Sequence, residues 1–205
     1  SCAFHPVRCE QNGNCEKIVS FAPQPDGWTF VELFYSGTNP DTNYAAVGFS
    51  HDELMGDDAV THCSFNDPSR AGAFLSRNIG KHNKPLNLTE EHRANNVELL
   101  QSTHKDNSVY CKFRQKMVPS QAAQEAHVPD LNQSYYLLLA YGKTNNPAEV
   151  SIHSLDANSK DFPTFISTPV NVAALADVHS VVPVAKQKPN SKRLFVLLHG
   201  NFFVP

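Results

Sequence analysis

Short runs of β-branched and aromatic residues alternate along the chain with clusters of Gly, Pro, Asn and Asp. This pattern predicts short strands separated by turns. Only Gln121–Ala126 has a helical pattern. Many short strands with little helix predict an all-β chain, folded as an immunoglobulin-like β-sandwich. We expect nine strands, at Lys17–Phe21, Trp28–Tyr35, Tyr44–Phe49, Ala59–Phe65, Ala73–Arg77, Val97–Thr103, Ser108–Gln115, Tyr135–Ala140 and Glu149–His153.

Two of these strands differ in how their apolar residues are spaced. Val109, Cys111 and Phe113 alternate with polar neighbours, which is typical of a strand with one face toward the core and one toward solvent. Tyr135–Ala140 is apolar without alternation. We therefore expect this strand to be central and covered on both faces.

The apolar pattern weakens toward the C-terminus. We expect the β-sandwich to occupy residues 1–172 and an extended tail or connector to occupy residues 173–205. Within the tail, Val181–Val184 and Leu194–Phe203 are apolar enough to pack as extra strands on a neighbouring surface. Such apolar segments and an odd number of cysteines point to self-assembly or to a disulfide-linked neighbour.

Charge and hydropathy exclude two kinds of partner. The formal net charge is −3, and the 17 basic residues are scattered along the chain rather than clustered. Nucleic acid is therefore not an expected partner, because phosphate binding requires a basic patch. No stretch approaches the roughly 20 apolar residues that cross a bilayer, so we expect no membrane span within this chain.

Cysteines and glycosylation motifs indicate an oxidising compartment. Of five cysteines, Cys2, Cys9 and Cys15 fall within the first fifteen residues, as in extracellular disulfide frameworks. Their pairing is left open, and one of the three lacks a partner. Asn87 and Asn132 each begin an N-glycosylation motif. We expect a glycoprotein with disulfide bonds, either secreted or on the extracellular face of a membrane.

One loop carries unusual chemistry for a surface segment. The chain has only two methionines, and Met55 lies at the tip of an acidic loop that follows the strand ending near Ser50. One interpretation is that Met55 plugs the end of the sandwich. The other is that its sulfur is a soft ligand for haem iron or copper. Met117 precedes Pro119 at a strand exit, and packing is its expected role.

The chain resembles the DOMON domains of ferric-chelate reductases and the haem-binding cytochrome domain of cellobiose dehydrogenase. The resemblance covers roughly Cys2 to Val172, and its specific part is the Met-Gly-Asp-Asp block with a downstream histidine. It is carried by Gly48–Asp52, Met55–Val60, Cys63, Tyr110–Arg114, Leu131–Gly142 and Glu149–Ser154.

This resemblance implies a cofactor and its ligands. In the haem-binding members, a methionine and a histidine are the axial ligands of haem b, and the matching residues here are Met55 and His153. Such an iron centre has no open coordination position and transfers single electrons. The resemblance also implies a disulfide between Cys63 and Cys111.

The implied role is an electron-transfer module of a reductase system rather than an enzyme acting alone. Its partners would be a redox protein or a small-molecule electron donor or acceptor. Two other functions stay open at this stage. One is a haem-free DOMON module that binds a small ligand such as a sugar, and the other is a structural assembly protein.

Other histidines and the acidic residues of the loop need separate interpretations. The chain has ten histidines. His51 shares the loop of Met55 and could face solvent or pair with Asp52, whereas the side chain of His62 should point away from the face that carries Cys63. Surface positions are expected for His104, His127 and His179. Four loop carboxylates would either attract a basic partner or metal chelate, or serve turn formation and solubility: Asp52, Glu53, Asp57 and Asp58.

Overall fold

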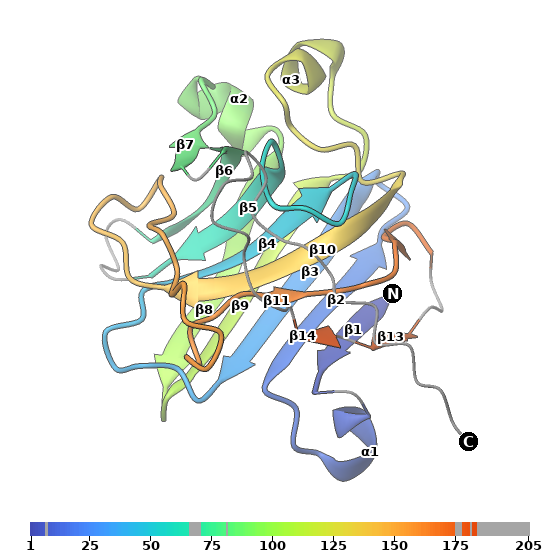
Figure 1. Cartoon of the computed structure of the whole chain (residues 1–205). Helices are drawn as coiled ribbons and strands as arrows, with labels where there is room; N and C mark the ends of the chain where they lie inside the picture. The colour runs from blue at the N-terminus through green and yellow to red at the C-terminus, as the bar shows by residue number, and fades with distance from the viewer. Residues whose placement is uncertain (7, 66–70, 81, 175–177, 181, 184–205) are drawn as a thin grey trace.

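Two β-sheets stack face to face in the computed structural model (Figure 1), which describes residues 1–6, 8–65, 71–80, 82–174, 178–180 and 182–183. Strands dominate the fold, and the predicted all-β sandwich is confirmed. The helices described are short: α1 (Cys9–Asn12), α2 (Glu90–Ala94) and α3 (Gln121–Glu125). The helix expected at Gln121–Ala126 is thus confirmed as α3. Its N-cap Ser120 accepts a hydrogen bond from the N–H of Ala123, as helix starts favour.

The first sheet contains six strands within the described chain, in the order β13-β1-β2-β3-β9-β8. Neighbouring strands are antiparallel, except that β1 and β13 run parallel. The longest ladder joins β3 to β9 from the pair Trp28–Lys116 to the pair Ser36–Ser108. The strands are β1 (Cys2–His5), β2 (Lys17–Pro23), β3 (Trp28–Ser36), β8 (Val97–Lys105), β9 (Ser108–Lys116) and β13 (Val178–Ser180).

The second sheet is antiparallel, with the order β14-β11-β10-β4-β5-β6-β7 and with β12 also paired to β10. Its centre is the β10–β4–β5 ladder, in which Leu138 lies opposite Gly48 and Gly48 lies opposite Val60. The strands are β4 (Tyr44–Ser50), β5 (Ala59–Ser64), β6 (Gly72–Ile79), β7 (His82–Pro85), β10 (Ser134–Gly142), β11 (Thr164–Phe165), β12 (Val170–Asn171) and β14 (Val182–Pro183).

The main core lies between the sheets and is built from alternate residues of the strands. In β9, Val109, Cys111 and Phe113 are buried while their neighbours are half-buried, which confirms the predicted alternation. A disulfide joins Cys63 of β5 to Cys111 of β9, with the two Cα atoms 6.4 Å apart. It therefore connects one sheet directly to the other.

The second sheet is also covered on its outer face. Leu138, Phe162 and Phe165 form an apolar cluster there, and Met55 and Tyr136 pack against it. Phe162 and Phe165 belong to the segment that follows β10, and Met55 belongs to the loop between β4 and β5. The predicted burial of Tyr135–Ala140 on both faces is confirmed.

Three features differ from the expectations or lie beyond them. The strand expected at Glu149–His153 is wrong, because this segment is irregular. Its backbone bonds to side chains instead: the N–H of Val150 donates to Asn83 Oδ1 at 3.1 Å, and the Tyr44 hydroxyl donates to the Ser151 carbonyl at 3.1 Å. Strands β1 and β7 lacked a strand pattern in the sequence. In the predicted tail, β13 and β14 pair with β1 and β11, and Leu194–Phe203 lies outside the described residues.

Candidate functional site

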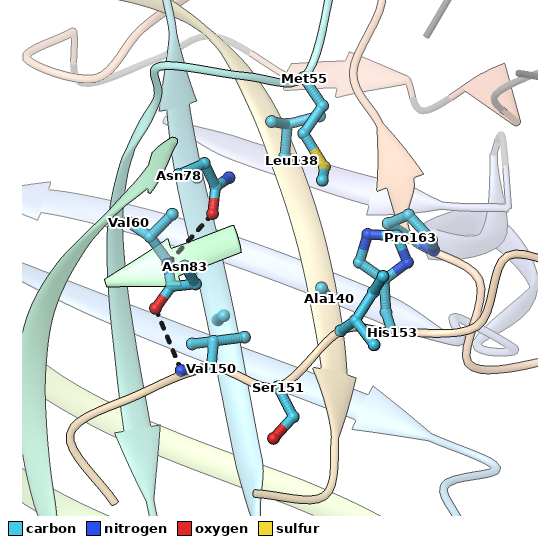
Figure 2. A pocket seen from close by; sticks show the side chains of 13 residues that line it. Met55, Val60, Asn78, Asn83, Leu138, Ala140, Val150, Ser151, His153 and Pro163 are labelled. Carbon is cyan, nitrogen blue, oxygen red and sulfur yellow. Dashed lines mark hydrogen bonds between the residues drawn. The ribbon is translucent and has the colours of Figure 1, made fainter. Parts of the chain in front are cut away.

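A pocket opens on the outer face of the second sheet, below the segments that cover it (Figure 2). It encloses about 530 Å³ of space, including the part that is open to solvent. Its floor is formed by small and apolar residues of the central strands, namely Ala46, Gly48, Val60, Leu138 and Ala140. Because these residues alternate with core residues along their strands, the pocket and the main core use opposite faces of the same sheet.

Gly48 leaves space above the floor of the pocket because it has no side chain. A Cβ atom at this position would lie 3.1 Å from the Cβ of Leu138 on the paired strand. That contact is tighter than side chains normally make, so any larger residue would displace Leu138 into the pocket. The glycine of the Gly-Phe-Ser-His motif therefore helps to shape the pocket.

Met55 reaches the pocket from the loop between β4 and β5. The loop is braced by its own acidic side chains: Asp52 Oδ1 accepts from the N–H of Leu54 at 2.8 Å, and Asp58 Oδ2 accepts from the N–H of Gly56 at 2.7 Å. Burial raises the pKa of Asp58 to about 6, against the hydrogen bonds that it accepts. These two carboxylates hold the turn on which Met55 is presented.

The other two acidic residues of the loop are placed differently. Glu53 is half-buried, and Asp57 is exposed with a left-handed backbone, φ 63°. No backbone bond to their carboxylates is found in the described chain. The role of the loop charges in attracting a partner stays a prediction, and these two residues are its best candidates.

His153 reaches the same pocket from the segment that follows β10. Several bonds anchor this segment on the outer face of the sheet. Asn43 exchanges two hydrogen bonds with the backbone of Thr144, at 2.9 and 2.7 Å. Further along, His62 Nε2 donates to the carbonyl of Pro147 at 3.0 Å. The bonds of Asn83 and Tyr44 described above complete the attachment.

The imidazole of His153 is held in one tautomer. Its Nδ1 donates to the carbonyl of Ser154 at 2.9 Å, which places the lone pair on Nε2. Burial lowers the pKa of His153, and the nearby charge of Lys17 lowers it further. The ring also meets Phe162 edge-on, with centroids 6.4 Å apart. A neutral imidazole fixed through Nδ1 is the form in which histidine binds metals.

His62 is a structural anchor and lies outside the pocket lining. It points away from the core face that carries Cys63 and stacks on Phe74, with ring centroids 5.6 Å apart. Complete burial lowers its pKa to about 4, opposed by the bond to Pro147. Nothing in the sequence around His62 marks this role, because the bond joins residues 85 positions apart.

The remaining predicted residues lie away from the pocket. His51 is exposed, with its ring 5.0 Å from that of Tyr135, so it and Met55 diverge from their shared loop. Met117 packs on the main core, as expected. Asn87 and Asn132 are both exposed, and their glycosylation stays a prediction.

All five cysteines belong to the described part of the chain. Besides the bond between the sheets, a second disulfide joins Cys9 and Cys15, with Cα atoms 4.8 Å apart. Cys2 on β1 has a free thiol and is half-buried. The odd cysteine expected from the sequence is therefore Cys2.

The described residues contain no helix long and apolar enough to cross a membrane. They also contain no group of three or more His, Cys, Asp or Glu side chains that could hold a metal ion. The pocket described above is of a different kind, since it combines one thioether with one imidazole.

The residues of this pocket fit a haem. Met55 and His153 come from loops far apart in the sequence, and Figure 2 shows both side chains on the side of the pocket next to Leu138 and Pro163. A soft thioether and a neutral imidazole form a known axial ligand pair for haem iron. The floor is apolar and low, as a flat macrocycle requires. Both residues lie on the outer face of the second sheet rather than between the two sheets.

Comparison with known proteins gives the family. Residues 30–142 match the model of the DOMON domain. A Drosophila melanogaster protein named as a ferric-chelate reductase 1 homologue is 26% identical over 205 residues, which is 100% of this chain and 28% of that protein. The DOMON domain-containing protein FRRS1L of Mus musculus is 29% identical over 114 residues, or 56% of this chain and 36% of that protein.

The human FRRS1L protein is 28% identical over the same length. The chain thus spans about a third or less of the length of these relatives. No solved structure gives a significant match. The family match covers more than half of the chain, and the strands that it spans, from β3 to β10, belong to both sheets. The chain belongs to the DOMON domain family.

Proposed function

We propose that this domain binds haem b and transfers single electrons, with Met55 and His153 as the axial ligands. One observation carries the proposal: two residues from distant segments, a thioether and an imidazole, line the same apolar pocket. Either residue alone would have a simpler explanation in packing. Packing alone does not require both residues to line one pocket above a floor that contains a glycine.

The surrounding residues have definite roles in this proposal. A bound haem iron with these two ligands would exchange single electrons between its ferric and ferrous states. The Ser154 carbonyl orients the imidazole of His153 and fixes its tautomer, as outer partners of metal ligands do. Leu138 and Phe162 exclude water from the side of the pocket next to Met55. The Asp52 and Asp58 carboxylates keep the loop of Met55 in place.

The proposed setting is extracellular, and the proposed partner is a redox protein or a small electron donor or acceptor. Two disulfides support an oxidising compartment. The name of the Drosophila relative refers to a ferric-chelate reductase, and the present chain spans 28% of that protein. We therefore propose an electron-transfer module that works with other domains or proteins rather than an enzyme acting alone.

The first test is the visible spectrum of the protein after incubation with haem. We expect a sharp Soret band, with narrow α and β bands upon reduction, as for low-spin iron with two strong axial ligands. Protein that elutes from a sizing column without haem, and that shows the spectrum of free haem in the mixture, would contradict the proposal.

The ligands can be identified by comparing single variants. His153→Ala should lose most of the haem, because the imidazole is the stronger ligand. Met55→Ala should retain haem but shift to a high-spin spectrum and a lower reduction potential, because a coordination position opens. Met117→Ala and His51→Ala are matched controls in which the low-spin spectrum should persist. A wild-type spectrum in both ligand variants would rule out this pair.

A further inference from the structure

A second pocket lies beside the first and is larger, enclosing about 820 Å³ by the same measure. It opens between β2 of the first sheet and the segment 157–164 of the second. Pro163 borders both pockets, so the two are back to back across this segment. Nothing in the proposed haem site uses it. Its lining is mixed, with several polar groups directed inward.

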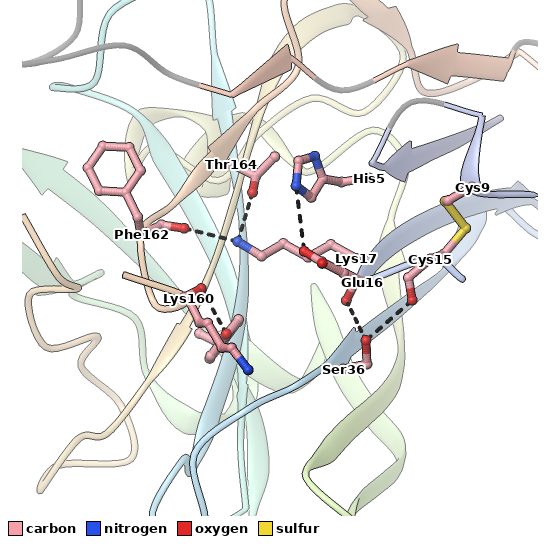
Figure 3. A network of polar contacts seen from close by, with 10 residues as sticks. His5, Cys9, Cys15, Glu16, Lys17, Ser36, Lys160, Phe162 and Thr164 are labelled. Atoms are coloured by element: carbon pink, nitrogen blue, oxygen red, sulfur yellow. Dashed lines mark hydrogen bonds and ion pairs between the residues drawn. A yellow bond between two sulfur atoms is a disulfide. The ribbon is translucent and has the colours of Figure 1, made fainter. Parts of the chain in front are cut away.

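Lys17 of β2 provides the central group of this pocket. Its side chain is 5% exposed, and its ammonium donates to Thr164 Oγ1 at 2.7 Å and to the Phe162 carbonyl at 3.0 Å, as Figure 3 shows. The ring of Tyr141 lies 5.3 Å from the ammonium. All of these partners are neutral.

No carboxylate of the described chain forms an ion pair with this ammonium. Buried charges in proteins are normally paired. Burial lowers the pKa of His5 in this pocket and of His153 in the first pocket, and the positive charge of Lys17 lowers both pKa values further. The pocket therefore contains a buried cation whose hydrogen-bond partners are neutral, while the carboxylates of Glu16 and Asp161 act on it without forming an ion pair.

The rim of the pocket carries charged groups of both signs. Lys160 brings a second ammonium to the rim near Gly37, at which a Cβ atom would be 3.9 Å from Lys160 Nζ. The Tyr141 hydroxyl holds the backbone of Lys160 there, donating to its carbonyl at 2.8 Å. Opposite, the exposed carboxylate of Glu16 lies 3.7 Å from His5 Nε2. A multiply charged anion would be repelled by Glu16, whereas a single carboxylate with hydroxyl groups would find partners on both sides.

We propose that this second pocket binds a small, singly charged organic acid, whose carboxylate is held by Lys17 and Lys160. The acid's hydroxyl groups would bond to the polar rim formed by Glu16 and Ser159. Charge-assisted hydrogen bonds of this kind are among the strongest in proteins, and the burial of Lys17 increases their strength. The inference is independent of the haem proposal, because the binding is to be measured on haem-free protein.

The test is calorimetric titration at neutral pH and constant ionic strength, with gluconate as the probe. Sorbitol is the matched neutral control, with the same six-carbon chain and a hydroxyl group in place of the carboxylate, and inorganic phosphate tests a multiply charged anion. Gluconate should bind saturably, sorbitol should not, and phosphate should bind more weakly than gluconate. No saturation by gluconate below about 50 mM, equal binding of sorbitol, or tighter binding of phosphate would overturn the proposal.

Variants then locate the site. Lys17→Met should weaken gluconate binding at least about tenfold, and Lys160→Ala about threefold. Lys105→Ala removes an exposed lysine on β8 and should change nothing. If Lys17→Met does not fold, NMR of the lysine ammonium groups in the wild-type protein decides the question. Gluconate should shift the signal of Lys17 and leave that of Lys105 in place, and the reverse pattern or no shift would refute the site.

Discussion

The ammonium of Lys17 connects two parts of the fold by hydrogen bonds, although burying its charge lowers the stability of the folded chain. One of its two hydrogen bonds joins β2 to Thr164 of β11, and the other reaches the Phe162 carbonyl, which lies two residues before that strand. Burial lowers its pKa from 10.5 to about 8, although Glu16 and Asp161 act in the other direction. The charged form is therefore less favourable in the folded than in the unfolded chain.

This difference predicts the pH dependence of stability. Between about pH 8 and 10.5 the unfolded chain binds more protons at Lys17 than the folded chain, so the free energy of unfolding rises with pH. Lys17 alone should contribute a rise of about 3 kcal/mol across this range. Urea unfolding at several pH values checks this expectation.

The matched variant is Lys17→Met, which keeps an unbranched side chain one atom shorter than lysine and cannot titrate. The raised pKa values of Tyr35 and Tyr44 work in the opposite direction at high pH, and they do so in both proteins. The wild type minus variant difference therefore isolates Lys17. Identical slopes in the two proteins would mean that this ammonium is hydrated in the folded state.

At the scale of elements, the pocket depends on a segment with no regular structure. The sequence predicted the strands that carry its floor, because continuous apolar residues identify them directly, as in Tyr44–Phe49 and Tyr135–Ala140. It failed at Glu149–His153, where Val150 and Ile152 imitate the alternation of a strand. The backbone there bonds to Asn83 and Tyr44, and such distant side-chain partners leave no local signal.

The position of the candidate ligands also could not be predicted from local sequence patterns. No periodicity or spacing connects Met55 with His153, and only the family resemblance paired them. Their location on the outer face of the sheet followed from the folded chain alone. The anchors Asn43, His62 and Asn83 had no signal in the sequence, since polar residues in loops are common and their bonding depends on the tertiary fold.

The attachment of the segment that carries His153 can be tested by removing one oxygen atom. Tyr44→Phe removes the hydroxyl that donates to the Ser151 carbonyl but keeps the buried ring. We expect a loss of about 1 kcal/mol in the free energy of unfolding. The segment that holds His153 should also become looser, so haem should dissociate about fivefold faster.

Tyr110→Phe is the matched control for this change. Its hydroxyl donates to Glu32 at 2.8 Å on the outer face of the first sheet, away from the pocket. The variant should change stability slightly and leave haem retention as in the wild type. Equal haem loss from both variants would show that the Tyr44 hydroxyl has no special role in positioning His153.

At the scale of the whole molecule, exposed motifs and crosslinks connect the fold to its expected compartment. Asn87 and Asn132 are both exposed, at opposite ends of the segment from β7 to β10. Protein secreted from animal cells should therefore carry two N-linked glycans. Asn87→Gln and Asn132→Gln should each lower its mass by one glycan, and Asn158→Gln, which lies in no such motif, should not. Unmodified mass in the secreted wild type would contradict this prediction.

The two disulfides are expected to contribute unequally to stability. The Cys63–Cys111 bond spans 48 residues and joins the two sheets, whereas Cys9–Cys15 spans 6 residues within one loop. In the chain-entropy model, closing the longer loop is worth about 4 kcal/mol and the shorter about 2 kcal/mol. Replacing both members of each pair by alanine should reproduce this order in urea unfolding.

Packing should widen the difference, because Cys63 and Cys111 are fully buried in the main core and alanine leaves a small cavity there. Their loss also removes the covalent link between β5 and β9. His62, which precedes Cys63 on β5 and points to the other face, anchors the segment of His153. The double variant at Cys63 and Cys111 should therefore lose haem faster as well as unfold more easily. Removing Cys9 and Cys15 should leave haem retention unchanged. An equal loss of stability in the two variants would show that the sheets hold together without their covalent link.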